Sequence, residues 1–298
     1  MMILALLSAI GTPFAGEAFN LGLGARAWGM GGAYTALATD PSGVYWNPGG
    51  LARAAGTGIL AMHGAFWQGL NYEFASITRE GLLGSFNGGL GIYYLGTGDI
   101  KKTQLPDSTL PPGDDNQPII TGTTSYQAYE LLFSLASRNG LGITIKAMGQ
   151  KADTASCYGV GLDLGYLRKN ESFGFGIVLK DALTTPLFWS TGRHETVAPS
   201  LTCGLAFEPA SWLIISGDGT LRVEGRGAAE LLYFGDISLE PRLGSEVVLG
   251  PARFRMGLSG KMPTLGAGFS VKRFSGDYAL IYSGDLGAGH RFSLGASF

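Results

Sequence analysis

The residues of this chain that could do acid, base or nucleophilic chemistry are few and scattered. Its three histidines are His63, His194 and His290. None lies in a G-x-S-x-G or H-E-x-x-H pattern, the arrangements that gather a nucleophile or a set of metal ligands in one place. His194 is followed by Glu195 in a loop-like segment, where a solvated pair is the simpler interpretation. The sequence therefore predicts a protein that is not an enzyme.

Metal and redox chemistry find equally little support. Asp114, Asp115 and Asn116 form an acidic run, but the twelve-residue pattern of a strong calcium loop is missing. Cys157 and Cys203 stand in separate strand-like segments, and the sequence leaves open whether they pair. We expect no metal site and no cofactor.

A glycine-rich stretch over residues 22–52 differs from the rest of the chain. Residues 22–27 match G-x-G-x-x-A, with Asp40 downstream. A dinucleotide site needs a buried strand before the motif and parallel βαβ units after it, and neither is predicted. The glycines allow positive φ and close backbone contact, so we interpret the stretch as a compact plug. Within it we expect a short helix over 33–38, ending before Asp40-Pro41.

Composition limits the class of protein. The chain has 298 residues, 49 of them glycine, with 15% charged residues and a net charge of −2. This length suits one large all-β unit or two ordinary domains. Nucleic-acid binding gains no support, because it requires a basic face or stripe.

The first residues predict a secretory signal peptide. Residues 1–15 are mostly apolar, and the small residues Gly16 and Ala18 suit signal peptidase, so we expect residues 1–18 to be removed. A buried N-terminal strand is the alternative. Elsewhere no run approaches the ~18 apolar residues of a spanning helix. A membrane form of this protein must therefore be a closed β-barrel.

From Gly56 onward, apolar residues alternate with small or polar ones. In the segment 158–167, Tyr, Val and Leu face one way, while Gly and Asp163 face the other. A face rich in Gly, Ser and Thr suits a lumen crowded by a plug better than a water-exposed surface. The predicted strands are 57–67, 70–79, 84–95, 124–137, 140–151, 156–168, 171–181, 199–208, 211–219, 237–249, 252–259, 264–274, 276–283 and 289–298. The sequence thus predicts an all-β fold, a 14-stranded antiparallel transmembrane β-barrel with an N-terminal hatch (plug) inside the lumen.

Short and long connections alternate along these strands, as in barrels with tight turns on one side of the membrane. The long connections are 96–123, 182–198 and 220–236. The second carries Leu187, Phe188 and Trp189, which we expect to form an exposed apolar loop tip for partner or ligand binding. The third contains the apolar residues 231–234, which suggest a short inserted element.

The plug, the middle and the end of the chain together resemble outer-membrane barrels of the PorV/PorQ type, relatives of the FadL fatty-acid channel. The family's plug signature is GAR…GMGGA…D…WNPAGLA, and Gly49 is the one departure, where Ala is usual. The last strand, with its terminal aromatic, resembles an outer-membrane assembly signal. The matching plug residues are Gly24, Arg26, Gly29, Met30, Gly31, Gly32, Asp40, Trp46, Asn47 and Pro48, and the assembly-signal residues are Phe292, Leu294 and Phe298.

The resemblance implies a domain order of signal peptide (1–18), hatch (19–55) and barrel (56–298), located in the bacterial outer membrane. It implies a role in type IX-like protein secretion, in which extracellular loops bind cargo or partner proteins. The alternative is a FadL-like passive channel for long-chain fatty acids or other hydrophobic molecules. The partners would then be outer-membrane lipid, with secretion-system proteins or hydrophobic small molecules. The predicted inner face shows no obvious apolar lining.

Two contacts inside the plug follow from physical chemistry. A charge in a plug is costly unless paired, so we expect Arg26 to bond a carboxylate, either Asp40 or the lumen-facing Asp163. We expect Trp46, Asn47 and Pro48 to fix the exit of the plug into the first strand, with the Asn side chain capping backbone groups.

Overall fold

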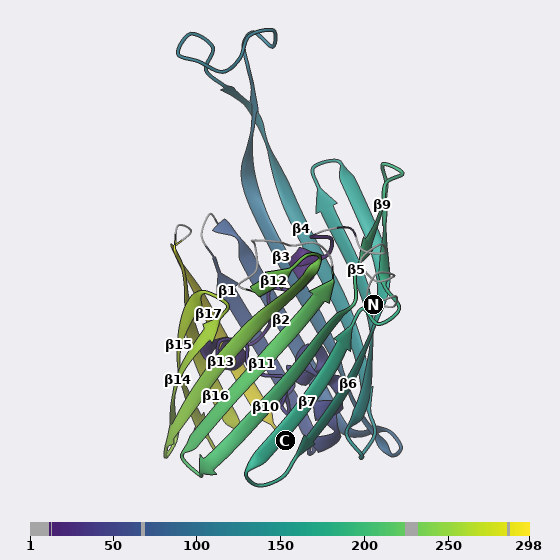
Figure 1. The fold of residues 1–298 in the computed structure, drawn as a ribbon, viewed down its shortest axis with the longest axis vertical. Helices are drawn as coiled ribbons and strands as arrows, with labels where there is room; N and C mark the ends of the chain where they lie inside the picture. The colour runs from purple at the N-terminus through teal and green to yellow at the C-terminus, as the bar shows by residue number, and fades with distance from the viewer. Residues whose placement is uncertain (1–11, 13, 67–68, 224–231, 285–286) are drawn as a thin grey trace.

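The computed structural model describes residue 12 and residues 14–66, 69–223, 232–284 and 287–298. Within these residues, fourteen strands form one antiparallel barrel, which closes where the first strand pairs with the last, from Gly58↔Ser297 to Ala65↔His290. Figure 1 shows the barrel from the side. Its strands are β1 (Thr57–Ala65), β2 (Asn71–Leu83), β3 (Phe86–Gln104), β4 (Ile119–Ala136), β5 (Leu141–Ala152), β6 (Ala155–Lys169), β7 (Phe173–Lys180), β10 (Ser200–Ala210), β11 (Leu213–Val223), β13 (Ile237–Leu249), β14 (Ala252–Ser259), β15 (Met262–Val271), β16 (Phe274–Ser283) and β17 (Gly287–Ser297). The predicted barrel is confirmed.

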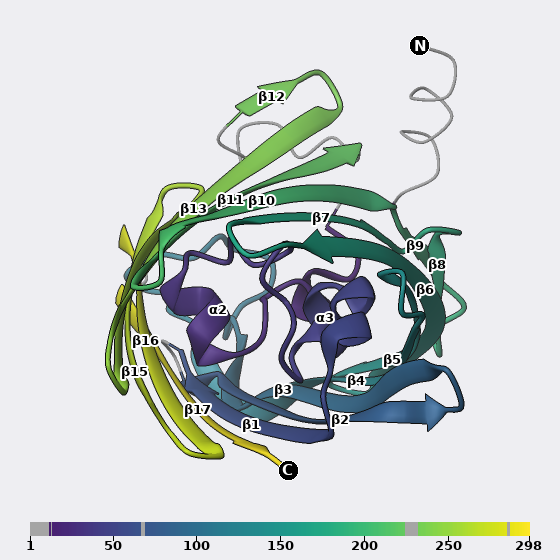
Figure 2. The same ribbon diagram turned by 90° about the horizontal axis from the view of Figure 1, so that it is seen from below.

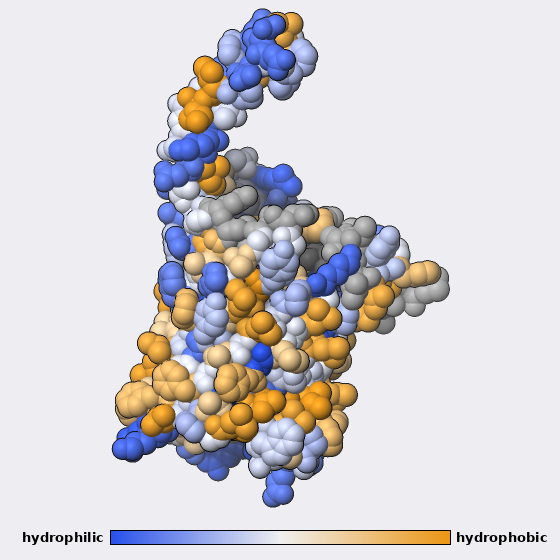
Figure 3. Space-filling model, turned by 90° about the vertical axis from the view of Figure 1, so that its left-hand side faces the viewer, coloured by the Kyte–Doolittle hydropathy of each residue, from blue (hydrophilic) through white to orange (hydrophobic). Residues whose placement is uncertain are grey.

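The alternation in the sequence becomes an inner and an outer surface. In β2, for example, Tyr72 and Phe74 are buried, while Ala75 and Ile77 are exposed. Large apolar side chains cover much of the lower outer wall in Figure 3. Closure of the sheet leaves no unpaired backbone groups facing lipid, and the outer wall is apolar. A membrane-spanning barrel requires both. The structure contains no helix, within the described residues, that is both long and apolar enough to cross a bilayer.

The two ends of the barrel differ. Thr57 and Phe298 lie at the same end, where their backbones exchange hydrogen bonds of 2.8 and 2.9 Å. The connections at this end are tight turns, for example between β4 and β5 or between β13 and β14. Short turns mark the periplasmic side of outer-membrane barrels, so the opposite end is the extracellular rim.

The plug lies inside the barrel, as Figure 2 shows from below. It consists of η1 (Glu17–Phe19), α2 (Ala25–Gly29), α3 (Gly43–Trp46) and η2 (Pro48–Arg53). The first two residues of η1 belong to the predicted signal peptide, and the remainder to the predicted hatch. The helix expected over 33–38 is wrong: this segment is a turn. The carboxylate of Asp218 accepts hydrogen bonds from the backbone N–H groups of Tyr34 and Thr35, which draws the segment onto β11.

Glycines let the plug approach the wall. A Cβ at Gly257 would lie 2.2 Å from the backbone nitrogen of Gly31, and one at Gly142 would lie 2.3 Å from the carbonyl carbon of Pro48. Gly31 also has φ of 65°. Any other residue at these wall positions would displace the plug, so glycine on the inner face makes room for it, as expected.

The predicted loop 96–123 is mostly strand. β3 and β4 continue past their neighbours as a two-stranded ribbon, paired from Thr97↔Tyr126 to Gln104↔Ile119, and only residues 105–118 form its tip. The ribbon extends far beyond the rim in Figures 1 and 3. β-Branched residues such as Ile100, Ile119 and Ile120 favour strand pairing. The polar residues around them made the segment look like a loop in the sequence.

The predicted loop 182–198 is also ordered. Its strands β8 (Thr185–Trp189) and β9 (His194–Val197) form a hairpin that pairs with β6. The prediction that Leu187, Phe188 and Trp189 together form an exposed apolar tip is wrong. Leu187 is 1% exposed, and the Trp189 indole donates a 3.0 Å hydrogen bond to Glu195. Phe188 remains the exposed member, at 38%.

Three further expectations concern the segment 231–234, the signal peptide and the cysteines. The short element expected over 231–234 is present as β12 (Leu232–Phe234), which pairs with β13; residue 231 lies outside the described part. Most of the predicted signal peptide, residues 1–11 and 13, also lies outside it, so its cleavage stays a prediction. Cys157 and Cys203 are both free, the first buried in β6 and the second exposed on β10.

Candidate functional site

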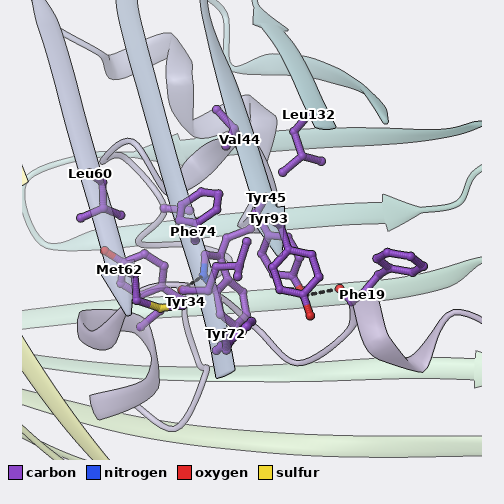
Figure 4. Packing of buried hydrophobic residues seen from close by; sticks show 14 of the residues in the cluster. Phe19, Tyr34, Val44, Tyr45, Leu60, Met62, Tyr72, Phe74, Tyr93 and Leu132 are labelled. Carbon is purple, nitrogen blue, oxygen red and sulfur yellow. Dashed lines mark hydrogen bonds between the residues drawn. The ribbon is translucent and has the colours of Figure 1, made fainter. Parts of the chain in front are cut away.

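The lumen has an apolar side. On strands β1 to β5, inward-facing apolar and aromatic side chains pack against plug residues such as Phe19, Val44 and Tyr45 (Figure 4). We call these wall residues the apolar sector. They are Leu60, Met62, Tyr72, Phe74, Tyr93, Leu95, Leu132 and Met148. The expectation that the inner face shows no apolar lining is therefore wrong. On these strands both the inward-facing and the outward-facing residues include large apolar side chains, so alternation alone did not reveal the inner ones.

Aromatic hydroxyl groups, one in the plug and one in this sector, hold the start of the plug in place. Tyr45 donates a 2.9 Å hydrogen bond to the carbonyl of Phe19 and accepts one of 3.1 Å from the backbone of Gly22. Tyr93 donates to the carbonyl of Ala18, and its ring meets Tyr72 edge-on, with 5.3 Å between ring centroids. Burial raises the pKa of the Tyr45 hydroxyl far above its ordinary value, so the group stays neutral.

Charge pairs line the lumen from β5 to β16, and we call them the charged sector. Lys146 bridges Asp163 and Asp181 at 2.8 and 3.0 Å, and all three side chains are almost fully buried. Other pairs follow around the wall. They are Arg222 with Glu240 at 2.8 Å, Arg242 with Glu240 at 3.0 Å, Arg255 with Glu246 at 2.5 Å and Arg255 with Asp277 at 2.8 Å. Mutual pairing keeps these ions tolerable away from bulk water.

Arg26 of α2 joins the plug to the charged sector. Its guanidinium donates to both carboxylate oxygens of Glu246, at 3.0 and 3.1 Å, and to the hydroxyl of Tyr34 at 3.2 Å. Asp40 lies 3.9 Å away and accepts from Tyr34, so this expected partner is part of the network. The alternative partner, Asp163, is wrong because Lys146 engages it. The main partner, Glu246, was not predicted from the sequence.

The guanidinium of Arg26 stays protonated among these neighbours. Burial by itself lowers the pKa of the guanidinium, but Tyr34, Glu246 and Asp40 outweigh burial and raise that pKa above its ordinary value. The plug therefore keeps a permanent cation against the wall.

Trp46, Asn47 and Pro48 fix the second half of the plug. The Trp46 indole donates a 2.6 Å hydrogen bond to the carbonyl of Leu23. The amide oxygen of Asn47 accepts from the backbone of Gly49 at 3.0 Å, and its nitrogen donates to the carbonyls of Thr35 and Tyr166 at 2.9 and 3.0 Å. Pro48 opens η2, the turn that leads to β1. The expected capping role of Asn47 agrees with this geometry, and the bond to Tyr166 on β6 adds a link to the wall.

The remaining predicted plug residues shape α2 and the turn that follows it. Gly24 precedes the helix with φ of 86°, and Gly32 follows it with φ of 75°. Gly29 lies against Gly266 and Arg255 on the wall. Met30 ends the helix and is 1% exposed. These residues act together to seat one short helix on β14, β15 and β16.

Three cavities lie between plug and wall. Two cavities beside Tyr45 and Lys180 have volumes of about 30 and 10 Å³, enough for about one water molecule each. A larger cavity of about 350 Å³ lies at the tight-turn end, lined by charged groups that include Arg26, Asp40 and Arg253.

The predicted assembly-signal residues lie on the outer surface of β17 and at the chain end. Phe292, Leu294 and Phe298 are 53%, 68% and 59% exposed. They share the outward face, as the alternation requires, and their role in assembly stays a prediction.

Comparison with known proteins identifies similar folds. No family model matches the chain, and no curated protein matches it either. Among solved structures, the Ralstonia pickettii toluene transporter TbuX is similar with a TM-score of 0.62 at 14% identity, over 94% of this chain and 100% of that one. The CymD monoaromatic hydrocarbon channel has a TM-score of 0.62 at 14% identity, over 93% and 98% of the two chains. The P. putida toluene transporter TodX has a TM-score of 0.61 at 12% identity, over 93% and 99%.

At these identities the likeness concerns the fold alone, which is a closed antiparallel barrel. An even number of strands in a single closed chain is also the rule for barrels of the bacterial outer membrane, where we place this protein. The similar structures are transporters and channels rather than enzymes.

Proposed function

We propose that this protein is a passive outer-membrane channel for small hydrophobic molecules. The observation that carries the proposal is the apolar sector, a patch on β1 to β5 that faces the plug. Glu130 on β4 and Lys146 on β5 are buried beside it. An apolar patch inside a lumen rich in charge pairs gives a hydrophobic molecule a favourable surface to follow. The fold shared with TbuX, CymD and TodX supports this choice, since those proteins are named for toluene and monoaromatic hydrocarbons.

Passage requires the plug to move. The space beside the apolar sector is filled by Phe19, Tyr34, Val44 and Tyr45 in the present arrangement. We infer that the plug shifts away from the apolar sector while the barrel stays closed, because the strands have no free edge at which to separate. The contacts of Arg26 and Asn47 with the wall hold the closed position.

A reversible covalent lock tests this gate. The Cβ of Ala36 in the plug lies 3.7 Å from the position of a Cβ at Gly174 on β7, which suits a disulfide. Ala36→Cys with Gly174→Cys, in a background of Cys157→Ala and Cys203→Ala, is expected to lower uptake of radiolabelled toluene by intact cells at least tenfold when oxidised. Reduction is expected to restore uptake.

The single variants Ala36→Cys and Gly174→Cys, treated in the same way, serve as controls and should be unaffected by the oxidant. Equal uptake by the locked and reduced proteins would show that the plug is not the gate. Uptake no greater than that of cells lacking the protein would overturn the channel itself.

The ribbon at the ends of β3 and β4 favours a second candidate, the PorV/PorQ-like role in binding secretion partners. It projects beyond the rim and exposes Ile100, Ile119 and Ile120 to solvent. Exposed apolar side chains on a projecting element are typical anchors for a partner protein. Affinity capture from native membranes with and without the ribbon tests this role, and an unchanged set of captured proteins would remove it.

A further inference from the structure

The outer wall carries a hollow that the channel does not use. It has a volume of about 470 Å³ and lies over β17, β1, β2 and β3. Its floor is the cross-strand pair Ala61 and Ala75, whose small side chains leave room between larger neighbours. Leu294 pairs with Ala61 on one side, and Ile92 pairs with Ala75 on the other. The volume falls within the usual ligand-pocket range of about 300–1,000 Å³.

The next rows of outward-facing residues flank the hollow at both ends. Toward the periplasmic end, Ile59 faces Ile77, and both are exposed. Toward the rim, His63 faces Glu73, between Phe292 of β17 and Tyr94 of β3. The result is an apolar cup with one polar end.

The polar end is a histidine–carboxylate pair on the outward face, two residues from the end of β1. His63 Nδ1 lies 2.6 Å from Glu73 Oε1, and the two side chains are 53% and 49% exposed. Ionisable groups are costly against hydrocarbon and commonly mark a functional site. Among the described residues, the other two polar atoms, His63 Nε2 and Glu73 Oε2, have no recorded partner.

The hollow is separate from the lumen. Met62 and Phe74, which border it, turn their side chains inward, where they are 3% and 2% exposed. Met62 accepts a 3.0 Å hydrogen bond from the backbone of Gly24 in the plug. The hollow is thus a site on the membrane face of a closed wall.

We propose that this hollow binds a single-chain amphiphile of the bilayer whose head is an uncharged hydroxyl group. The hydrocarbon chain lies over Ala61 and Ala75, and the hydroxyl bonds the free atoms of the His63 and Glu73 pair. A hydroxyl group both donates and accepts hydrogen bonds, so it can donate to Glu73 Oε2 and pair with His63 Nε2 whichever ring nitrogen carries the proton. Glu73 repels an anionic head, which favours the neutral hydroxyl.

Photolabelling of the intact protein in lipid nanodiscs tests the site. The probes are a dodecanol with a diazirine in its chain and the matched dodecane without the hydroxyl. The alcohol is expected to label peptides containing Ala61 or Ala75 at least fivefold more than the alkane, and unlabelled 1-dodecanol should compete. Equal labelling by the two probes would overturn the proposal.

Variants separate the two ends of the hollow. Ala61→Leu with Ala75→Leu fills the floor and should abolish the labelling by the alcohol. Ala147→Leu, at another exposed alanine on β5, should leave it unchanged. His63→Leu with Glu73→Leu keeps the chain contact but removes the polar end, so the preference for the alcohol should disappear while alkane labelling persists.

A second copy of the chain is the competing occupant. If the two leucine substitutions on the floor turn a dimer into a monomer in sedimentation experiments, the hollow is a protein interface and the proposal fails. Because labelling is read without transport, these outcomes are independent of toluene uptake.

Discussion

Arg26 and Glu246 connect parts of the chain that lie 220 residues apart, and their contact holds α2 against the wall. Glu246 is 1% exposed, and Arg26 is 29% exposed toward the cavity at the tight-turn end. Two bonds to one carboxylate fix both the position and the orientation of the helix. This pair is a two-bond, charged link between plug and barrel.

We predict that Arg26→Ala lowers the free energy of unfolding by about 1–3 kcal/mol, because a buried carboxylate loses charged hydrogen bonds while Arg255 still compensates part of its charge. Urea unfolding in detergent measures the change. Arg253→Ala is the matched control: Arg253 lines the same cavity, but its recorded hydrogen bond is with the carbonyl of Pro251. An unchanged stability of Arg26→Ala would contradict the anchoring role.

Asn47 is completely buried, with three hydrogen bonds in the plug and to β6. We predict that Asn47→Ala and Asn47→Asp each cost about 1–3 kcal/mol. The Asp variant places a carboxylate beside two carbonyl oxygens, which raises its pKa in the folded state. Its stability relative to Asn47→Ala should therefore rise as pH falls, since the neutral acid can donate a hydrogen bond. A pH-independent difference between the two variants would argue against this geometry.

At the scale of elements, the ribbon of β3 and β4 stands apart from the barrel. Beyond Thr97 and Tyr126 each of its strands pairs with the other, and a two-stranded ribbon is only marginally stable alone. At its base, Lys102 contacts both carboxylate oxygens of Asp153 at 2.7 Å. This bond and one from Thr124 lower the pKa of Asp153, so the contact weakens as pH falls through that lowered value.

We predict that replacing residues 98–125 with an Asn-Gly turn leaves the heat stability of the barrel and toluene uptake within twofold of the parent. The turn suits the direct pairing of Thr97 with Tyr126. Heat-dependent gel mobility and uptake measure the two quantities. Loss of the folded barrel would mean that the ribbon is needed for closure rather than for contacts outside the rim.

At the scale of the whole molecule, closure depends on the last residue meeting the first strand. Phe298 exchanges backbone hydrogen bonds with Thr57, while its side chain points into the surroundings. An exposed side chain adds little to folded stability, so packing within the chain does not explain a phenylalanine at this position. Recognition by the assembly machinery is the explanation that we expect.

We predict that Phe298→Ala reduces the amount of assembled barrel in the outer membrane at least threefold, while the purified fraction unfolds at the parent's urea concentration. Phe274→Ala, at an outward position of β16 that is 60% exposed, is the control and should assemble normally. Equal assembly of both variants would contradict a terminal assembly signal.

The strands and the plug were predictable because their signals are local. Alternation within one strand, as over 158–167, determines which residues share a face, and glycine clusters mark where the backbone turns sharply. The hairpin of β8 and β9 and the ribbon of β3 and β4 were missed, because polar and Pro-containing segments look like loops until a neighbouring strand supplies their pairing.

The sequence by itself determined a closed wall with an apolar outside and a plug at its start, since period-two patterning and glycine placement are properties of neighbouring residues. Only the tertiary structure decided that Arg26 bonds Glu246, that the apolar lining gathers on β1 to β5, and that Ala61 and Ala75 form the floor of a hollow. These facts depend on strand register and on closure of the barrel, which bring together residues whose separation in the chain carries no signal.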